Sequence, residues 1–341
     1  MDYKVTLAMP VYNVEKYIER ALLSALNQTF DSMEFLIVDD KGTDNSMDIV
    51  SRIVASHPCG KNVRIIDHGV NRGVGAVRNT AIKEAKGRYI YFMDSDDEIT
   101  PDCIRLLYDA MQKNHVDFVA ASYVRKDTQG KTVSEYVYKD AVLSVSGKKM
   151  ADWVYNDNLA IEVTVWNKLY DLSFLRKHEI SCLPRHFSED ILFTFQLVLK
   201  AASCVLLSDI TYYYYVIPNS ITDEKSRTRE RSTEIAKQHI EILDFKKRYL
   251  RDYTCESWYL RALALLMPES FFYAYWVLKS SIKEKRQYVN RMLCSPMKWP
   301  EVARYNKAKA YLFYLLTLSP YFIKVSAINL YHKYTLSKRN G

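Results

Sequence analysis

The chain has 341 residues, of which 48% are apolar, enough for one large domain with an appendage or for two modest domains. Nine glycines and nine prolines exclude a long low-complexity linker. The net charge of +8 is uneven, because residues 1–220 carry 25 Lys or Arg against 29 Asp or Glu, whereas residues 221–341 carry 23 against 11. This asymmetry indicates two regions with different roles.

The first 125 residues alternate β-rich runs with amphipathic helical patterns, one of which opens at Thr100-Pro101. The predicted strands are Val5–Met9, Phe35–Val38, Val63–Ile66, Tyr89–Met93 and Phe118–Ala121. Nearly continuous apolar strands separated by helices predict an α/β fold, in which a mostly parallel sheet carries helices on both faces.

The following residues complete this region and then change character. We expect a hairpin around Thr128-Gln129-Gly130, a helical piece from about Ser146, a helix capped by Ser188, and strands Cys204–Leu207 and Tyr212–Val216. From about Thr228 the pattern is helical, basic and aromatic. The predicted domains are residues 1–225, divided into halves 1–122 and 123–225, and a helical C-terminal region, 226–341.

Polar side chains follow three of the predicted strands, where ligands bind in open α/β sheets. The first strand ends in Pro10-Val11-Tyr12-Asn13, the second in Asp39-Asp40 and the fourth in Asp94-Ser95-Asp96-Asp97. Two acidic clusters at neighbouring strand ends repel each other unless a cation or hydrogen-bond donors lie between them. Such oxygen ligands suit Mg²⁺ or Mn²⁺. In the alternative interpretation, Asp96-Asp97 only leads into the next turn.

The stretch Gly73-Val74-Gly75-Ala76-Val77-Arg78 looks like the start of a dinucleotide-binding fingerprint. It ends in Arg instead of Gly and follows the third strand instead of the first, so we reject a nicotinamide-dependent enzyme.

The ordered set of motifs resembles the family-2 glycosyltransferases of GT-A fold over residues 3–220. The motifs are Val5-Thr-Leu-Ala-Met-Pro-Val-Tyr-Asn13, Phe35-Leu-Ile-Val-Asp-Asp40, Asn71-Arg-Gly73, Ala76-Val-Arg-Asn79 and Gly87-Arg-Tyr-Ile-Tyr-Phe-Met-Asp-Ser-Asp-Asp97. The resemblance implies a GT-A type, Rossmann-like sheet, with a nucleotide-sugar-binding half (1–122) and an acceptor-side half (123–225).

The resemblance also implies roles for the strand-end residues. Tyr12 would stack on the nucleotide base and Asp40 would bond to the edge of the base, although both could instead be structural loop residues. Asp94 would lie near the ribose and the metal, and Asp96 would bind Mn²⁺ or Mg²⁺ between the two phosphates. The nucleotide-sugar site would comprise Pro10, Tyr12, Asn13, Asp40, Arg78, Asp94, Ser95 and Asp96. In the alternative interpretation, Arg78 is only a solvent-exposed residue on a helix.

A second set of residues, Phe187-Ser188-Glu189-Asp190, opens a helix. In the resembling family this Glu-Asp pair supplies the general base, and the second residue, Asp190 here, takes the proton of the acceptor hydroxyl. A carboxylate base suits a displacement with inversion. An ordinary first-turn acid that stabilises its helix is the alternative.

Three further residues are candidates for the acceptor side, namely Glu189, His186 and Trp166, with a core position as the alternative for Trp166. Asn219-Ser220-Ile221-Thr222 is a candidate for closing over the donor. The Gln-x-x-Arg-Trp motif of processive synthases is absent from the sequence, which favours addition of a single sugar.

The sequence therefore predicts an inverting glycosyltransferase that uses a nucleotide diphosphate sugar, a UDP-sugar by family habit. A lipid-linked saccharide in bacterial envelope or capsular polysaccharide synthesis is the expected acceptor. A sugar nucleotidyltransferase is an alternative, but a glycine-rich basic loop should then follow the first strand. A catalytically degenerate GT-A binding protein is another, and the intact Asp94, Asp96 and Asp190 speak against it.

The C-terminal region suggests a partner. Its positive charges lie along helices with large aromatic residues, which favours an anionic lipid surface over nucleic acid. Two apolar groups could enter the lipid, Phe271, Phe272, Tyr275 and Trp276, and later Tyr311, Leu312, Phe313, Leu315 and Leu316, or they could pack on the catalytic domain. No signal peptide is visible, and the longest apolar stretch, Tyr311 to Ile323, falls short of the ~20 residues of a membrane span. We therefore expect a cytoplasmic protein, peripheral at the inner face of the cytoplasmic membrane.

Overall fold

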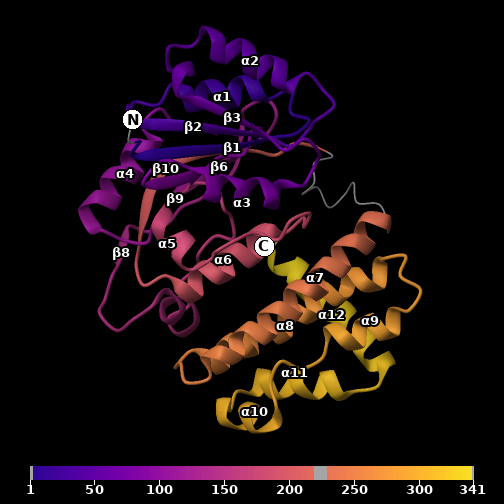
Figure 1. Ribbon diagram of the computed structural model, residues 1–341. Coiled ribbons are helices and arrows are strands. Elements are labelled where there is room, and N and C mark those ends of the chain that lie inside the picture. Colours follow the sequence, from indigo (N-terminus) through magenta and orange to yellow (C-terminus); the bar gives the residue numbers. More distant parts are fainter. Residues whose placement is uncertain (1–2, 219–228, 340–341) are drawn as a thin grey trace. The chain divides into compact units, whose positions relative to one another are not determined.

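The computed structural model describes residues 3–218 and 229–339 (Figure 1). The chain divides into two compact units. Unit 1 comprises Met1–Met150 and Ile161–Ser220, and unit 2 comprises Ala151–Ala160 and Ile221–Gly341. The candidate donor-closing stretch 219–222 lies outside the described residues.

Unit 1 is an α/β unit, as predicted. Its strands are β1 (Val5–Val11), β2 (Met33–Asp39), β3 (Val63–Asp67), β4 (Tyr89–Phe92), β5 (Glu98–Ile99), β6 (Phe118–Lys126), β7 (Thr132–Tyr136), β8 (Ala141–Leu143), β9 (Lys168–Asp171) and β10 (Cys204–Tyr215). Its α-helices are α1 (Ile18–Leu26), α2 (Ser46–Ser56), α3 (Val74–Glu84), α4 (Cys103–Asn114), α5 (Leu172–Lys177) and α6 (Glu189–Lys200).

In the described part of the chain these strands form one ten-stranded sheet with the order β3-β2-β1-β4-β9-β6-β10-β5. The neighbours β3, β2, β1 and β4 are parallel, and β6 is parallel to β10. β9 is antiparallel to both β4 and β6, which it separates. β7 pairs with β6 in the predicted hairpin. The short strands β5 and β8 both pair antiparallel with β10. The expectation of a mostly parallel sheet is therefore confirmed for the main strands, with the inserted β9 and the short strands β5, β7 and β8 as antiparallel exceptions.

Helices cover both faces of the sheet because its strands are apolar on both sides. The main core lies on the face covered by α1, α2 and α4, where Leu7, Phe35 and Tyr91 pack against Leu22, Ile104 and neighbouring residues. Figure 1 shows α1 and α2 on one side of β1–β3 and α3 on the other.

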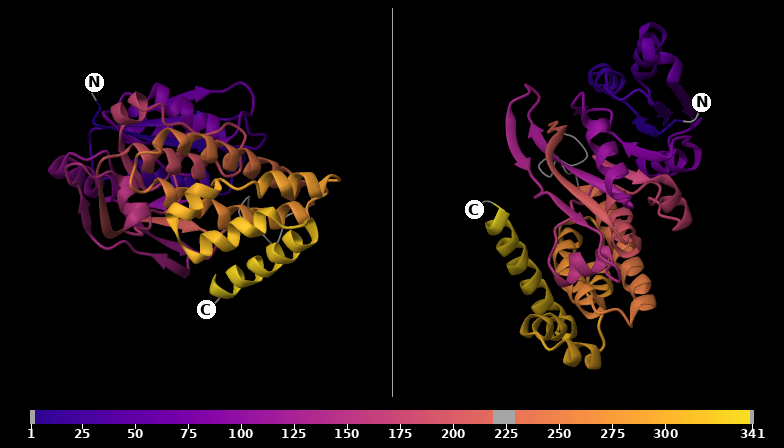
Figure 2. Two further views of the ribbon diagram at one scale, coloured as in Figure 1. Left: turned by 90° about the horizontal axis from the view of Figure 1, so that it is seen from below. Right: turned by 90° about the vertical axis from the view of Figure 1, so that its left-hand side faces the viewer.

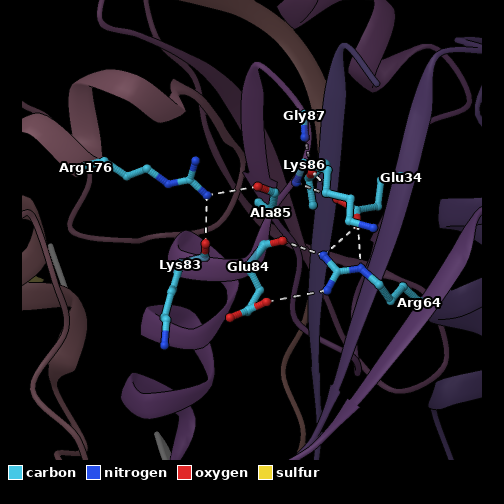
Figure 3. Close-up of polar contacts among 9 residues, drawn as sticks. Glu34, Arg64, Lys83, Glu84, Ala85, Lys86, Gly87 and Arg176 are labelled. Atoms are coloured by element: carbon cyan, nitrogen blue, oxygen red, sulfur yellow. Dashed lines mark hydrogen bonds and ion pairs between the residues drawn. The ribbon is translucent and has the colours of Figure 1, made fainter. Parts of the chain in front are cut away.

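The C-terminal end of α3 is held by two arginines from other elements (Figure 3). Arg176 of α5 donates to the carbonyls of Ile82, Lys83 and Ala85, each at 2.9 Å. Arg64 of β3 donates to the Glu84 carbonyl. These bonds satisfy carbonyls that a helix end leaves without partners, and so they fix the direction of α3.

At the amino ends of the strands, Arg64 also donates to the buried carboxylate of Glu34 at 2.8 Å. Glu34 accepts further bonds from the Thr6 hydroxyl at 2.7 Å and the Lys86 amide at 2.9 Å. This network joins β1, β2 and β3 to the segment between α3 and β4, at the edge opposite the candidate site.

Several predicted elements of unit 1 are corrected by the structure. The two runs after residue 203 are one strand, β10, with register shifts between Leu207 and Tyr212. α4 begins at Cys103 after Asp102, two residues later than Thr100-Pro101 predicts.

Two predicted helix starts differ as well. α6 begins directly after Ser188 as expected, but within the described residues the Ser188 side chain makes no capping bond. The helical piece expected from Ser146 is a short π-helix, η2 (Asp152–Asn156), which belongs to unit 2.

Unit 2 is otherwise helical, as predicted from Thr228 onward. It contains α7 (Arg229–Tyr249), η4 (Leu250–Tyr253), α8 (Tyr259–Lys279), α9 (Lys285–Met292), α10 (Trp299–Tyr305), α11 (Ala308–Leu318) and α12 (Tyr321–Arg339). α8 is central, since α7, α9, α10, α11 and α12 all contact it. Figure 2 shows these helices from two further sides.

The aromatic group on α8 that the sequence offered to a lipid surface contributes to the packing of unit 2. Phe271 is 1% exposed and packs on Phe313 of α11 with ring centroids 5.1 Å apart. Tyr275 stacks on His332 of α12 at 3.5 Å. Of the helices in residues 3–218 and 229–339, none combines the length and apolarity that a membrane span requires.

Candidate active site

The polar strand ends predicted from the sequence lie at one edge of the sheet. β2, β1 and β4 are neighbours and parallel, with Val11 opposite Asp39 and Ala8 opposite Phe92. Their carboxyl ends therefore meet at the same edge. The residues that follow each strand form the candidate site.

The turn after β4 is held by its last carboxylate, Asp97, which is 1% exposed. Asp97 accepts from the Tyr212 hydroxyl at 2.7 Å and from the Tyr215 amide at 2.8 Å. The Tyr212 oxygen in turn accepts from the Asp94 amide at 3.2 Å. Asp97 thus ties the turn to β10, which distinguishes it from Asp94 and Asp96.

Arg20 of α1 braces the same turn, and sequence reasoning missed it. Its guanidinium donates to the Asp96 carbonyl at 2.7 Å and lies 2.8 Å from the Glu98 carboxylate. It also lies 3.6 Å from the centroid of the Tyr215 ring, a cation–π contact. The sequence carries no signal for this role, because Arg20 lies 76 residues from its partner Asp96.

The Asp96 carboxylate is partly buried beside that of Asp94. Burial, together with the neighbouring charge of Asp94, raises the pKa of Asp96 to about 6, although Arg20 opposes the shift. Among the described residues, no group of three or more His, Cys, Asp or Glu side chains is arranged to hold a metal ion. The donor set therefore fits a hard cation bound by one or two carboxylates and completed by phosphate oxygens, as Mg²⁺ usually is, and not an all-protein site.

Arg78 of α3 connects this turn to the start of α6. It is 4% exposed and donates to the Asp94 carboxylate at 3.0 Å and to the Glu189 carboxylate. Burial lowers the pKa of Arg78, but the charges of Glu189 and Asp94 outweigh this and raise it. Arg78 is therefore a charged, buried bridge, which rules out the solvated alternative.

The two acids of α6 have different surroundings. Glu189 is paired with Arg78, and burial raises the pKa of its carboxyl while the charge of Arg78 opposes the shift. Asp190 accepts a hydrogen bond from the Ile191 amide at 2.9 Å, and burial raises its pKa, while Arg78 lowers it. Of the two acids, Asp190 is therefore the one whose carboxylate is available to accept a proton.

The Asp40 carboxylate is already bonded within the protein, so it is poorly suited to bond to a nucleotide base. Its Oδ1 accepts from the Arg72 amide at 2.9 Å and contacts His68 Nδ1 at 2.8 Å, and its Oδ2 accepts from the Gly73 amide at 2.8 Å. His68 Nε2 contacts the Thr80 hydroxyl at 2.9 Å. Asp40 therefore organises the segment between β3 and α3, which favours the structural alternative.

The other residues after β1 include both exposed and bonded side chains. Tyr12 is 47% exposed, so its ring is accessible to a ligand. Asn13 accepts from the Thr43 amide at 2.7 Å, with its own backbone at a φ of 52°. Asn13 thus connects the loops after β1 and β2.

The glycines that resembled a dinucleotide fingerprint serve close packing. A Cβ on Gly75 would lie 2.3 Å from the Leu183 carbonyl oxygen, and one on Gly73 would lie 3.1 Å from the backbone of Arg185. The segment leading to Asp190 therefore lies directly on the start of α3. His186, half-buried, belongs to this segment.

Trp166 is part of the core. It is 8% exposed and stacks on Tyr212 at 4.5 Å and on Tyr214 at 5.6 Å. This arrangement favours the core alternative over a sugar platform. Through Tyr212, Trp166 supports the turn that holds Asp94 and Asp97.

Comparison with known proteins places this chain in a family. The family model described as Glycosyl transferase family group 2 matches residues 89–323, and that described as Glycosyl transferase family 2 matches residues 6–157. The chain belongs to the family-2 glycosyltransferases.

Among its curated relatives is a poly(ribitol-phosphate) beta-glucosyltransferase of Bacillus spizizenii, 35% identical over 62% of this chain and 32% of the relative. A putative glycosyltransferase, EpsH of Bacillus subtilis, is 33% identical over 64% of this chain and 62% of its own length. The chain therefore spans less than two thirds of these relatives.

Solved structures share the fold at low sequence identity. Staphylococcus aureus TarS 1–349 in complex with UDP-GlcNAc has a TM-score of 0.57 and 21% identity, covering 94% of this chain and 81% of that one. The mannosyltransferase PcManGT from Pyrobaculum calidifontis, in complex with GDP-Man and Mn²⁺, has a TM-score of 0.51 and 15% identity, covering 97% and 88%. These neighbours are glycosyltransferases, in agreement with the predicted GT-A fold.

Proposed function

We propose that this chain is an inverting glycosyltransferase that moves a hexosyl or N-acetylhexosaminyl group from a UDP-sugar to an acceptor hydroxyl. The observation that carries the proposal is the buried Arg78 bridge, which brings Asp94 after β4 and Glu189 beside Asp190 into one site. A site for the leaving nucleotide and a base for the acceptor are the two parts that such a displacement needs.

In the proposed reaction the acceptor oxygen attacks the anomeric carbon and the bond to the diphosphate oxygen breaks. Asp190 takes the proton of the acceptor hydroxyl. Tyr12 stacks on the base, and Pro10, Asn13 and Ser95 line the same edge. Arg78 holds Asp94 in place, and Arg20 holds the carbonyl of Asp96.

Asp94 and Asp96 would hold Mn²⁺ or Mg²⁺ together with the donor diphosphate. When bound, such an ion stabilises the negative charge that develops on the departing nucleotide. The raised pKa of Asp96, which burial and the neighbouring charge of Asp94 cause, supports this assignment, as does the Mn²⁺ in the complex of PcManGT. Glu189 acts through Arg78, and His186 is the acceptor-side candidate in the preceding segment.

The relatives support a donor and an acceptor class. TarS binds UDP-GlcNAc, and the Bacillus spizizenii relative is named for a poly(ribitol-phosphate) acceptor. We propose a lipid-linked saccharide in bacterial envelope or capsular polysaccharide synthesis as the acceptor. The chain would then work in the cytoplasm at the inner membrane face.

A donor screen tests this function. The protein is incubated with UDP-, GDP- and dTDP-sugars and Mn²⁺, and release of the nucleoside diphosphate is measured with and without excess chelator. We expect turnover of one UDP-sugar, abolished by the chelator, and a product of inverted anomeric configuration by NMR. Binding of nucleotide sugars without turnover, with or without acceptor saccharides, would favour a degenerate binding protein. A retained configuration would contradict Asp190 as the base.

A further inference from the structure

The outward side of α11 is apolar. Leu312, Leu315 and Leu318 are 56%, 59% and 66% exposed, at spacings that place them along the solvent side of one helix. The opposite side of α11 is also apolar, since Phe313 packs on Phe271 of α8 and on Tyr331 of α12. A helix that is apolar all round requires an apolar neighbour on each side.

The next helix, α12, also exposes large apolar side chains. Phe322 and Leu330 are 70% and 71% exposed, whereas Ile328 and His332 are buried in unit 2. α11 and α12 contact each other. Within the described residues, every leucine among the exposed large apolar side chains except Leu265 lies on one of these two helices. We call Leu312, Leu315, Leu318, Phe322 and Leu330 the α11–α12 apolar face.

The charge of this segment has one sign. From Val302 to Gly341 the sequence contains seven Lys or Arg and no Asp or Glu. Arg304, Lys307 and Lys309, just before and at the start of α11, are exposed. The apolar face is therefore accompanied by positive charge without compensating acids in the same segment.

We propose that the α11–α12 apolar face is a docking surface for a bilayer that contains anionic lipid. The leucines and Phe322 would enter the interface, and Arg304, Lys307 and Lys309 would contact the headgroups, as in interfacial helices. Docking would bring the enzyme to the lipid-linked acceptor proposed above, so the biological role of this surface rests on the proposed function. Binding to the bilayer itself needs neither donor nor acceptor.

The positive charge of this segment also favours an anionic bilayer over a second copy of the chain as the partner. A symmetric dimer through this face would bring two sets of uncompensated positive charges together, which opposes association. An anionic bilayer offers both an apolar layer and the complementary charge. Nucleic acid would satisfy the charge but would leave the leucines exposed.

Vesicle flotation of the full chain, without donor, tests the docking surface. Vesicles of phosphatidylcholine with phosphatidylglycerol are compared with phosphatidylcholine alone, at low and high salt. Two triple variants are compared with the wild type, one with Leu312, Leu315 and Leu318 changed to Gln and one with Arg304, Lys307 and Lys309 changed to Gln. Leu265→Gln controls for an exposed leucine elsewhere, and a triple change of Lys61, Lys113 and Lys131 to Gln controls for the lost charge.

We expect the wild type and both controls to float with anionic vesicles at low salt and less at high salt. The variant that lacks Arg304, Lys307 and Lys309 should bind at least about tenfold more weakly, since each exposed basic residue near anionic lipid is worth roughly a fivefold change. The leucine variant should also bind at least about tenfold more weakly, because it lacks the apolar side chains that enter the interface. Circular dichroism and thermal unfolding should match the wild type, because the substituted side chains are exposed.

Three results would overturn the proposal. The wild type could remain soluble beside anionic vesicles at low salt, or the leucine variant could float like the wild type. The leucine variant could also turn a wild-type dimer into a monomer in light scattering, which would identify a second copy as the occupant. Donor turnover measured without vesicles is separate, so a failed flotation would leave the proposed function standing.

Discussion

The buried guanidinium of Arg78 has two carboxylate partners from distant parts of the chain, Asp94 after β4 and Glu189 at the start of α6. A buried charge is tolerated only when it is paired, so the three side chains depend on one another. This dependence explains why the first acid of the Glu-Asp pair is the weaker candidate for the base. Glu189 positions Arg78, and Asp190 is left for the chemistry.

At the residue scale, Asp190→Asn should lower transfer by about 10²–10⁴-fold, because an amide cannot accept the acceptor's proton. Affinity for UDP, measured by calorimetry, should stay close to that of the wild type. Asp48→Asn, which changes the first-turn acid of α2, is the matched control and should be nearly silent. Loss of nucleotide affinity with surviving turnover of the bound fraction would refute the assignment.

Asp96→Ala should abolish donor turnover and weaken the binding of Mn²⁺ in the presence of UDP, because it removes a hard oxygen ligand. Electron paramagnetic resonance of Mn²⁺ provides a readout that does not depend on activity. Asp109→Ala, which removes an exposed carboxylate on α4, should change neither quantity. Mn²⁺ binding that is unchanged in Asp96→Ala would exclude Asp96 as a ligand.

Lys168 gives a prediction about pH. Its ammonium donates to the carbonyls of Glu162 and Thr164 and to the Thr164 hydroxyl, and burial lowers its pKa to about 7. An unfolded lysine titrates near pH ~10.4, so between these values the unfolded chain binds one more proton than the folded chain. Lys168 therefore makes the free energy of unfolding rise with pH from about 7 toward 10.

The check is urea unfolding of the wild type and Lys168→Met at pH 7, 8 and 9. The variant should be less stable at every pH, because three buried oxygens lose their donor. Its deficit should grow as the pH rises, since only the wild type gains from this titration. Parallel stability curves would show that Lys168 keeps its ordinary pKa in the fold.

The strand-end carboxylates could be predicted from sequence because each follows a long apolar run. Arg20 and Tyr212 could not, since their roles arise from contacts with residues 76 and 118 positions away. The role of Asp40 was also hidden. Besides His68, its partners are the backbone amides of Arg72 and Gly73, and every residue type except proline supplies such an amide.

At the element scale, periodicity located the long elements and missed the short ones. β5 has only two residues, and β9 has the sequence Lys-Leu-Tyr-Asp, whose charged ends hide a strand pattern. Both strands pair with edges that their neighbours leave open. β10 was divided in two because the polar residues Ser208 and Asp209 lie where its register shifts. The pairing of β9 with β4 and β6 depends on long-range contacts, which the local sequence does not encode.

The packing of the segment 182–186 on α3 predicts the effect of Gly75→Ala. The new Cβ would lie 2.3 Å from the Leu183 carbonyl oxygen, so the segment that precedes Asp190 must move. We expect a loss of about 1–3 kcal/mol of stability and a marked fall in transfer per folded molecule.

Gly60→Ala is the matched control for Gly75→Ala. Its Cβ would lie 1.9 Å from the Val54 carbonyl oxygen, beside α2 and away from the site residues named above. It should also lose stability but keep its transfer rate per folded molecule. Equal loss of transfer in the two variants would mean that general destabilisation, and not displacement of Asp190, causes the effect.

At the scale of the whole molecule, the charge asymmetry read from the sequence coincides with a change of architecture. The acidic part forms the α/β unit, whose carboxylates gather at one edge of the sheet, and the basic part forms the helical unit with the α11–α12 apolar face. Composition alone indicated two roles, but it could not separate the aromatic residues that pack inside unit 2 from the leucines that remain exposed.

The insertion of β9 between β4 and β6 has a consequence for how the protein is made. During synthesis, β4 and β6 are complete when residue 126 leaves the ribosome, but the strand that joins them ends only at Asp171. Because synthesis proceeds at about 5–20 residues per second, the edges of β4 and β6 that β9 will occupy stay unpaired for a time on the order of seconds. Open apolar edges in a nascent chain invite pairing with other chains. Fragments that end between residues 126 and 168 should therefore aggregate, and the nucleotide-binding half should not be separable from the residues that complete its sheet.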